Sequence, residues 1–203
     1  MTSKPKLRPR FLRNLLLSVN FDLFAIHDVL SLHVDQSRFK LSTFESLVLV
    51  LEDRRFKRHI GIDVKSVLRN IFYALIKRRH GGGSTIDMQL VRTITNRREK
   101  TIRRKLREML LAVLLQLRYS KLTILRSYIS IAYFGTGLDG AAAASCKCFN
   151  KLPSELSVDE AACVASMLVY PRPRTPSEAW QLKIDRRASY GKAVYIANPE
   201  KFK

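Results

Sequence analysis

The sequence is poor in cysteine, glycine, proline and acidic residues. Its 203 residues include three Cys, eight Gly and seven Pro. The small, odd number of cysteines excludes a disulfide scaffold, and the low glycine and proline content excludes collagen-like and low-complexity chains. There are 17 Asp and Glu against 37 Lys and Arg, which gives a formal net charge of +20. A surface this basic favours nucleic acid, an anionic membrane face or a phosphate-bearing substrate as its partner.

Long hydrophobic runs are also missing. No stretch of about 18 apolar residues occurs, so the sequence predicts no helix that spans a bilayer. The best candidate, residues 11–34, is interrupted by charged and polar side chains, and it lacks the features of a signal peptide. We interpret residues 1–36 as a basic, amphipathic segment. We favour an ordinary helix packed on the domain over a helix that lies on an anionic membrane surface.

Helical periodicity dominates the rest of the chain. Hydrophobic residues make up 46% of the sequence, which is enough for a sizeable core. No strand-like alternation of useful length and no internal repeat occurs. Apolar residues at helical spacing predict helices over residues 41–51, 64–76, 86–94, 102–117, 124–134, 141–149 and 158–169. We therefore expect a mainly α fold.

Two adjacent carboxylates follow a buried-looking apolar run. Glu52 and Asp53 come directly after residues 47–51. A carboxylate at the end of a buried element is poorly solvated, which makes it a stronger proton acceptor. The alternative is that the pair forms the solvated end of a helix, and composition alone favours that alternative.

The densest positive segment spans residues 97–107. Arg104 and Lys105 lie four and three residues before Glu108, so all three share one helix face. This segment is a salt-bridged solvated face, a site for a phosphate ester, or a nucleic-acid surface. Aromatic residues do not interleave with its charges, which argues against a groove that stacks single-stranded bases.

Two further patterns are weak. His59 and Asp63 have the i, i+4 spacing of metal ligands on a helix, but Gly61 lies between them, so we expect a hydrogen-bonded structural histidine instead. The glycine run at 81–83 before Ser84 could present amides to phosphate, but it lacks the lysine of a Walker loop. By itself, it is typical of a flexible linker.

Taken together, five motifs in order resemble the peptidoglycan glycosyltransferases of family 51. Residues 52–63 meet every specified position of E-D-x-x-F-x-x-H-x-G-x-D, the first signature of that family. The other four are similar to GGSTITQQ, RKxxE, the KxxIL motif and RRxxVL, and lie at residues 82–86, 104–108, 121–135 and 186–187. The resemblance covers about residues 41–190. It includes the glycan-polymerising domains of class A penicillin-binding proteins and the monofunctional transglycosylases.

The resemblance implies a lysozyme-like, two-lobed α domain over residues 37–190, followed by a tail at 191–203. It also implies polymerisation of lipid II into β-1,4-linked glycan by inverting transfer, with polyprenyl diphosphate as the leaving group. Glu52 would be the general base that takes the proton from the acceptor sugar's 4-hydroxyl. Glu108 would be the second carboxylate, near the diphosphate and the donor sugar.

The resemblance also assigns substrate-binding residues: a support for Glu52, a donor groove and a set of cations at the leaving diphosphate. Asp53 would support Glu52. Ser84, Thr85 and Gln89 would line the donor groove. Arg92, Arg104 and Lys105 would neutralise the leaving diphosphate. Beyond these, a divalent cation, Mg²⁺ or Mn²⁺, is the one cofactor that would suit a departing diphosphate. His59 and Asp63 would serve folding of the first motif.

The expected partners are lipid II, lipid-linked glycan, an anionic membrane surface and other cell-wall synthesis proteins. The expected location is peripheral, at the periplasmic face of the bacterial inner membrane. Several positions depart from the family pattern: Asp87 would bring a negative charge to the donor groove, Met88 replaces Gln, and Arg126 and Ser130 replace Glu and Asn. Two alternatives therefore stay open, a catalytically degenerate protein that binds lipid II or glycan and, less favoured, a nucleic-acid-binding protein.

Overall fold

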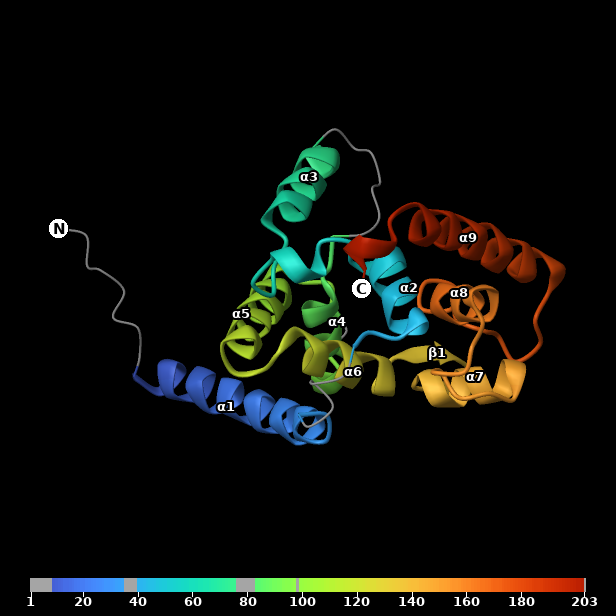
Figure 1. Cartoon of the computed structure of the whole chain (residues 1–203). Helices are drawn as coiled ribbons and strands as arrows, with labels where there is room; N and C mark the ends of the chain where they lie inside the picture. The colour runs from blue at the N-terminus through green and yellow to red at the C-terminus, as the bar shows by residue number, and fades with distance from the viewer. Residues whose placement is uncertain (1–8, 35–39, 76–82, 98, 203) are drawn as a thin grey trace.

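The structure is a computed structural model that describes residues 9–34, 40–75, 83–97 and 99–202 (Figure 1). Within these ranges the α-helices are α1 (Pro9–Ser31), α2 (Thr43–Glu52), α3 (Val64–Leu75), α4 (Ile86–Thr95), α5 (Ile102–Arg118), α6 (Lys121–Ile131), α7 (Ala141–Phe149), α8 (Val158–Ser166) and α9 (Glu178–Ala197). Two short 3₁₀ helices, η2 (Phe56–Arg58) and η3 (Pro199–Lys201), and two short strands, β1 (Tyr133–Gly135) and β2 (Leu138–Asp139), complete the described elements. The mainly α prediction is confirmed, and the arrangement is consistent with a lysozyme-like domain.

Helix α2 forms the centre of the core. Its N-terminus is fixed by a capping box in which Ser42 and Glu45 exchange side-chain hydrogen bonds with each other's backbone amides. Every residue of α2 from Phe44 to Val50 is buried, and the helix packs on α8 and α9. On the other side α4 packs on α5 and α6. Figure 1 shows α7, α8 and α9 on one side of the molecule and α1, α3 and α5 on the other.

Several predicted helices begin where the structure has them. Helix α7 has the predicted bounds, and α8 starts at Val158 behind a capping box of Ser157 and Glu160 but ends at Ser166 instead of the predicted residue 169. The prediction that the 124–134 helix continues to Phe134 is wrong, because α6 ends at Ile131 and the chain enters β1. Strand β1 pairs antiparallel with β2, and Gly135 of β1 forms an isolated bridge with Arg172. Strands this short leave no alternating pattern in the sequence.

The C-terminal region is more structured than the sequence indicates. Helix α9 is absent from the predicted helices, and it runs without a break across the expected domain boundary at residue 190. Beyond it, Phe202 is 3% exposed and its carbonyl accepts a 2.8 Å hydrogen bond from Ser46 Oγ of α2. The chain end is therefore packed on the core. The expected boundary at residue 36 lies outside the described residues.

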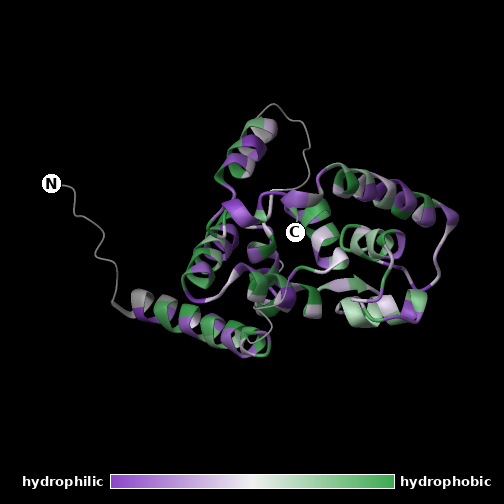
Figure 2. Ribbon diagram, viewed as in Figure 1, coloured by the Kyte–Doolittle hydropathy of each residue, from purple (hydrophilic) through white to green (hydrophobic). Residues whose placement is uncertain are grey.

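Helix α1 confirms the predicted amphipathic segment. One face packs on α4 and α6 and buries Ile26 and Leu30. The other face exposes large apolar side chains, among them Phe21 and Phe24 at 76% and 71%. Hydrophobic and hydrophilic residues alternate along this helix in Figure 2. No described helix is both long and apolar enough to span a membrane.

Candidate functional site

Glu52, the last residue of α2, is held between two other helices. Its Oε1 accepts a 2.9 Å hydrogen bond from Arg187 Nη2 of α9, and its Oε2 accepts one of 3.3 Å from Gln89 Nε2 of α4. Arg187 comes within reach because Gly191 lets α9 approach α2: a Cβ there would lie 2.9 Å from Leu51 Cδ2. Only 8% of the Glu52 side chain is exposed. The interpretation of Glu52 and Asp53 as a solvated helix end is therefore wrong.

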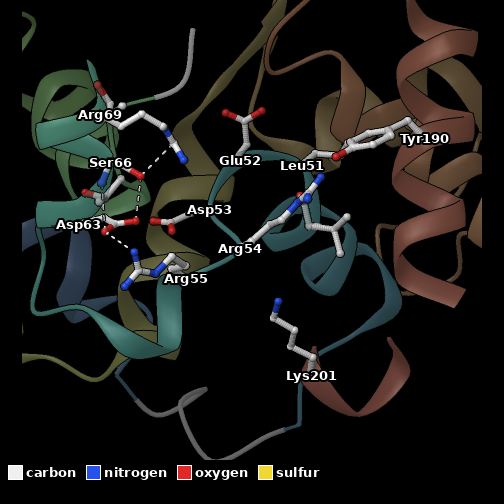
Figure 3. Close-up of a pocket in the computed structure, with 14 residues that line it drawn as sticks. Leu51, Glu52, Asp53, Arg54, Arg55, Asp63, Ser66, Arg69, Tyr190 and Lys201 are labelled. Carbon is white, nitrogen blue, oxygen red and sulfur yellow. Dashed lines mark hydrogen bonds and ion pairs between the residues drawn. The ribbon is translucent and has the colours of Figure 1, made fainter. Parts of the chain in front are cut away.

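The Glu52 side chain lines a polar cavity of about 600 Å³ (Figure 3). Helix α2, the loop after it, α3, the start of α4 and the C-terminal region all contribute to its wall. The charged lining residues are Glu52, Asp53, Asp63, Arg54, Arg55, Arg69 and Lys201. Such a mixed wall suits a substrate that carries hydroxyl and anionic groups.

Asp53 lines the same cavity as Glu52 but has different hydrogen-bond partners. It is buried, its Oδ2 lies 2.9 Å from His59 Nε2, and the same oxygen accepts a 3.2 Å hydrogen bond from the backbone N–H of Ile86. These contacts tie the first motif to the N-terminus of α4, where a helix favours negative charge. Through this tie Asp53 supports the position of its neighbour Glu52.

Asp87 lies behind this contact rather than in a groove. It is 0% exposed and accepts hydrogen bonds from Gln116 Nε2 and, at 3.5 Å, from Lys121 Nζ. The expectation that Asp87 brings negative charge to the donor groove is wrong, because this side of α4 faces the core. Burial raises the pKa of Asp87, which Lys121 partly offsets, and burial lowers the pKa of Lys121.

The same cluster contains residue types that ligate divalent cations. Among the described residues, Asp53, His59 and Asp87 place one ligand atom each within 4.8 Å of one another. However, Lys121 Nζ lies 3.4 Å from His59 Nδ1 and 3.5 Å from Asp87 Oδ2, so an ammonium already neutralises this space. The residues do not fit a second cation there, and no catalytic step is derived through one.

His59 and Asp63 have separate partners. Asp63 directly precedes α3, where it accepts hydrogen bonds from the amide of Lys65 and the hydroxyl of Ser66 and pairs with Arg55 at 3.0 Å. Burial alone would raise the pKa of Asp63, but the contacts with Ser66 and Arg55 outweigh it and lower that pKa. His59 is buried and its Nε2 lies 2.9 Å from Asp53 Oδ2, which confirms the expected hydrogen-bonded structural histidine.

Ser84 and Thr85 lie at the wall of the Glu52 cavity. Thr85 caps α4, and its hydroxyl donates a 2.7 Å hydrogen bond to the carbonyl of Gly61. Gly61 has φ +86°, and a Cβ there would lie 2.4 Å from the carbonyl oxygen of Ala112. Thr85 is thus a buried connector between the first and second motifs, while Ser84 accepts a 2.9 Å hydrogen bond from Lys105 Nζ.

A second cavity of about 460 Å³ lies on the far side of Gln89. Its wall carries three cationic side chains, Arg92, Lys100 and Arg104. Gln89 belongs to this wall, donates to Glu52, and accepts a 2.7 Å hydrogen bond from the Tyr128 hydroxyl. One amide therefore connects the carboxylate of the first cavity to the cation-lined second one.

Glu108 lies on α5 and is 3% exposed. Arg104 Nη1 donates to its Oε1, and Lys105 Nζ lies 3.5 Å from its Oε2. These contacts confirm the shared helix face predicted from the i, i+3 and i, i+4 spacing. Glu108 lines neither of the two cavities, so its reach to a ligand passes through its two cations.

Sequence reasoning missed three residues of the site. Arg187 was noted only as part of a fifth motif, although it binds Glu52, and Tyr128, which orients Gln89, was noted only within the fourth. Lys100 was counted only among the clustered charges. The R-R pair at 186–187 is the one signal that could have placed Arg187, but α9 itself was not predicted.

Comparisons with known proteins agree with these motifs. A family model described as Transglycosylase matches residues 36–193. The chain is 39% identical over 130 residues to penicillin-binding protein 1F of Bacillus subtilis (64% of this chain, 18% of that protein). It is 38% identical over 144 residues to penicillin-binding protein 2a of Streptococcus pneumoniae (70% and 19%) and 36% identical over 140 residues to penicillin-binding protein 1A of Aquifex aeolicus (67% and 19%).

The chain thus spans less than a fifth of the length of these relatives. The family match, in contrast, covers most of this chain and includes the motif residues from Glu52 to Arg187. The chain belongs to the transglycosylase family, family 51 of the glycosyltransferases, and is homologous to the glycosyltransferase domains of class A penicillin-binding proteins.

Proposed function

We propose that the chain is a peptidoglycan glycosyltransferase that polymerises lipid II into β-1,4-linked glycan. One observation carries the proposal: Glu52, poorly exposed, lines a cavity of about 600 Å³ and is joined through Gln89 to a second cavity lined by cations. A glycosyl transfer between two lipid-linked sugars needs both a base at the acceptor and positive charge at the leaving diphosphate.

The acceptor belongs in the cavity of Glu52. A sugar 4-hydroxyl is a weak nucleophile, and Glu52 would take its proton as the oxygen attacks the anomeric carbon of the donor. The new C–O bond forms as the bond to the diphosphate oxygen breaks on the opposite face, so the anomeric configuration inverts. The proton ends on Glu52, and Arg187 and Gln89 hold the carboxylate in place during the transfer.

The donor's diphosphate belongs beside the second cavity. Arg92, Lys100 and Arg104 line it, and they would neutralise the charge that develops on the leaving group. Lys105, which contacts Ser84, would add to them from the edge of the first cavity. Glu108 would act by fixing Arg104 and Lys105 rather than by touching the reacting atoms.

Both substrates carry lipid tails, so we propose a peripheral location on an anionic membrane surface. The exposed apolar side chains of α1, including Leu17, Phe21 and Phe24, recur at helical spacing on one face. The basic residues before this helix would add electrostatic attraction to anionic lipid. The resemblance to peptidoglycan glycosyltransferases supports the periplasmic face of the inner membrane as that location.

The test is polymerisation of labelled lipid II in detergent by the wild-type chain, Glu52→Gln and Glu178→Gln. Glu178 is an exposed carboxylate in the first turn of α9 and provides the matched control. We expect product from the wild type and the control and none from Glu52→Gln, with equal circular dichroism for all three. Wild-type chain that binds lipid II but never extends it would instead support the degenerate binding protein.

A further inference from the structure

We propose that Lys201 and Arg54 form an anion-binding edge of the Glu52 cavity that holds an anionic group of the acceptor. This inference rests on the proposed function and concerns the substrate of that same site. Lys201 lies beyond residues 36–193, the part of the chain that matches the family model, yet it lines the cavity that Glu52 lines. The C-terminal region would therefore complete the site.

The backbone around Lys201 is anchored. Lys201 ends η3 and its N–H donates a 3.2 Å hydrogen bond to the carbonyl of Asn198. The next residue, Phe202, is buried in the core and bound to Ser46 of α2, the helix that ends in Glu52. The Lys201 side chain is thus presented from a fixed position, and Figure 3 shows its ammonium pointing towards Arg54.

Arg54 forms the other half of the edge. Its Nε donates a 3.1 Å hydrogen bond to the carbonyl of Val50, and its guanidinium lies 5.1 Å from the centre of the Tyr190 ring. These contacts orient the guanidinium without neutralising it. Arg54 and Lys201 also line a smaller neighbouring cavity of about 270 Å³, so both charges stay accessible.

The other cations that line the large cavity are Arg55 and Arg69. Arg55 pairs with Asp63 at 3.0 Å, and Arg69 donates a 3.2 Å hydrogen bond to the hydroxyl of Ser66. Among the described residues, no ion pair joins a carboxylate to Lys201 or Arg54, although Asp53 and Glu200 line the smaller cavity beside them. Two cations without an ion-pair partner at one edge favour a bound anion.

An acceptor lipid II offers two kinds of anionic group, its diphosphate and the carboxylates of its peptide. Because Glu52 lies in the same cavity, an anion held at this edge would position the acceptor's hydroxyl for proton transfer. The donor's diphosphate would remain with the separate cations around Gln89. Because the edge lies at the Glu52 cavity and away from the cations around Gln89, it would bind the acceptor and not the donor.

The experiment varies lipid II as acceptor against a saturating, preformed lipid-linked glycan donor. It compares the wild type with Lys201→Ala, Lys201→Arg and the control Lys183→Ala, an exposed lysine of α9 that lines none of the cavities described above. We expect Lys201→Ala to raise the acceptor KM about tenfold with kcat within about twofold, Lys201→Arg to restore it, and the control to be silent. Unchanged melting temperatures show that Phe202 keeps its place.

The outcomes separate the two proposals. If the wild type polymerises lipid II and Lys201→Ala leaves the acceptor KM unchanged, the anion-binding edge is overturned and the proposed function stands. If the wild type does not polymerise, the proposed function fails, and equilibrium binding of lipid II decides the edge: weaker binding by Lys201→Ala supports it, and equal or absent binding overturns it. Lipid II with amidated peptide carboxylates identifies the anion, because loss of the Lys201 effect indicates the peptide and its persistence the diphosphate.

Discussion

Glu52 and Glu108 are both poorly exposed carboxylates with cationic neighbours, yet their surroundings differ in kind. Glu52 is bound by Arg187 and Gln89, which come from two other helices, and it lines a cavity. Glu108 is bound by Arg104 and Lys105 of its own helix and lines neither cavity. In the proposed reaction the first carboxylate would meet a ligand directly, whereas the second would hold cations that meet one.

The clearest test of the difference between the two carboxylates is to remove each charge in turn. Glu52→Gln keeps the shape of the side chain and one of its two acceptor oxygens but loses the proton acceptor, and loss of a general base costs on the order of 10²–10⁴ in rate. We expect kcat for lipid II polymerisation to fall by that factor, and the loss of the counter-charge of Arg187 to lower the melting temperature without unfolding the chain. A fall of only a fewfold would show that the two carboxylates do not differ in role.

The ion pair of Lys121 and Asp87 lies behind Glu52, and its loss should lower the free energy of unfolding. Lys121→Met leaves Asp87 buried without its cation, and breaking a buried ion pair costs about 3 kcal/mol or more. Chemical denaturation of Lys121→Met, Asp87→Asn and the double variant measures the coupling. We expect the double variant to recover part of the loss, and strictly additive losses would contradict the pairing.

Glu108→Gln should lower kcat less than Glu52→Gln does, and it should lower the free energy of unfolding less than Lys121→Met does. The amide leaves Arg104 and Lys105 without their counter-charge, and a lost charged hydrogen bond costs about 2 kcal/mol. We expect a lower denaturation midpoint and a raised KM for lipid II, with kcat changed less than in Glu52→Gln. If Glu108→Gln instead abolishes turnover at full stability, Glu108 acts on the reacting atoms and the distinction drawn above is wrong.

The same contrast explains how much of the site the sequence could predict. The contacts of Glu108 follow from spacing within one helix, so they were predicted. The contact of Glu52 with Arg187 joins residues 135 positions apart through α9, a helix whose buried residues, Ile184, Ala188 and Gly191, are few and partly small. A helix that buries so little apolar surface has no clear hydrophobic period, and the helix was missed.

Asp87 shows a second limit. The motif placed it correctly in α4 between residues assigned to the donor groove, but a motif does not state which side of a helix faces the core. Asp87 lies on the buried side, whereas Gln89, two positions later, faces the site. Successive helical residues are about 100° apart, so neighbours in a motif can serve packing and chemistry separately.

The finest difference between the two carboxylates should appear in the pH dependence. Lys105, which joins Glu108 to Ser84, has a lowered pKa because burial disfavours its charge more than Glu108 restores it. If its ammonium helps to hold the leaving diphosphate, activity falls as pH rises through this lowered pKa, earlier than for an exposed lysine. Lys105→Arg keeps the charge at every accessible pH, so we expect the alkaline limb of kcat/KM to move to higher pH with the neutral-pH rate changed little. An alkaline limb that stays in place in Lys105→Arg would assign it to another group and leave Lys105 a structural link between α5 and the Glu52 cavity.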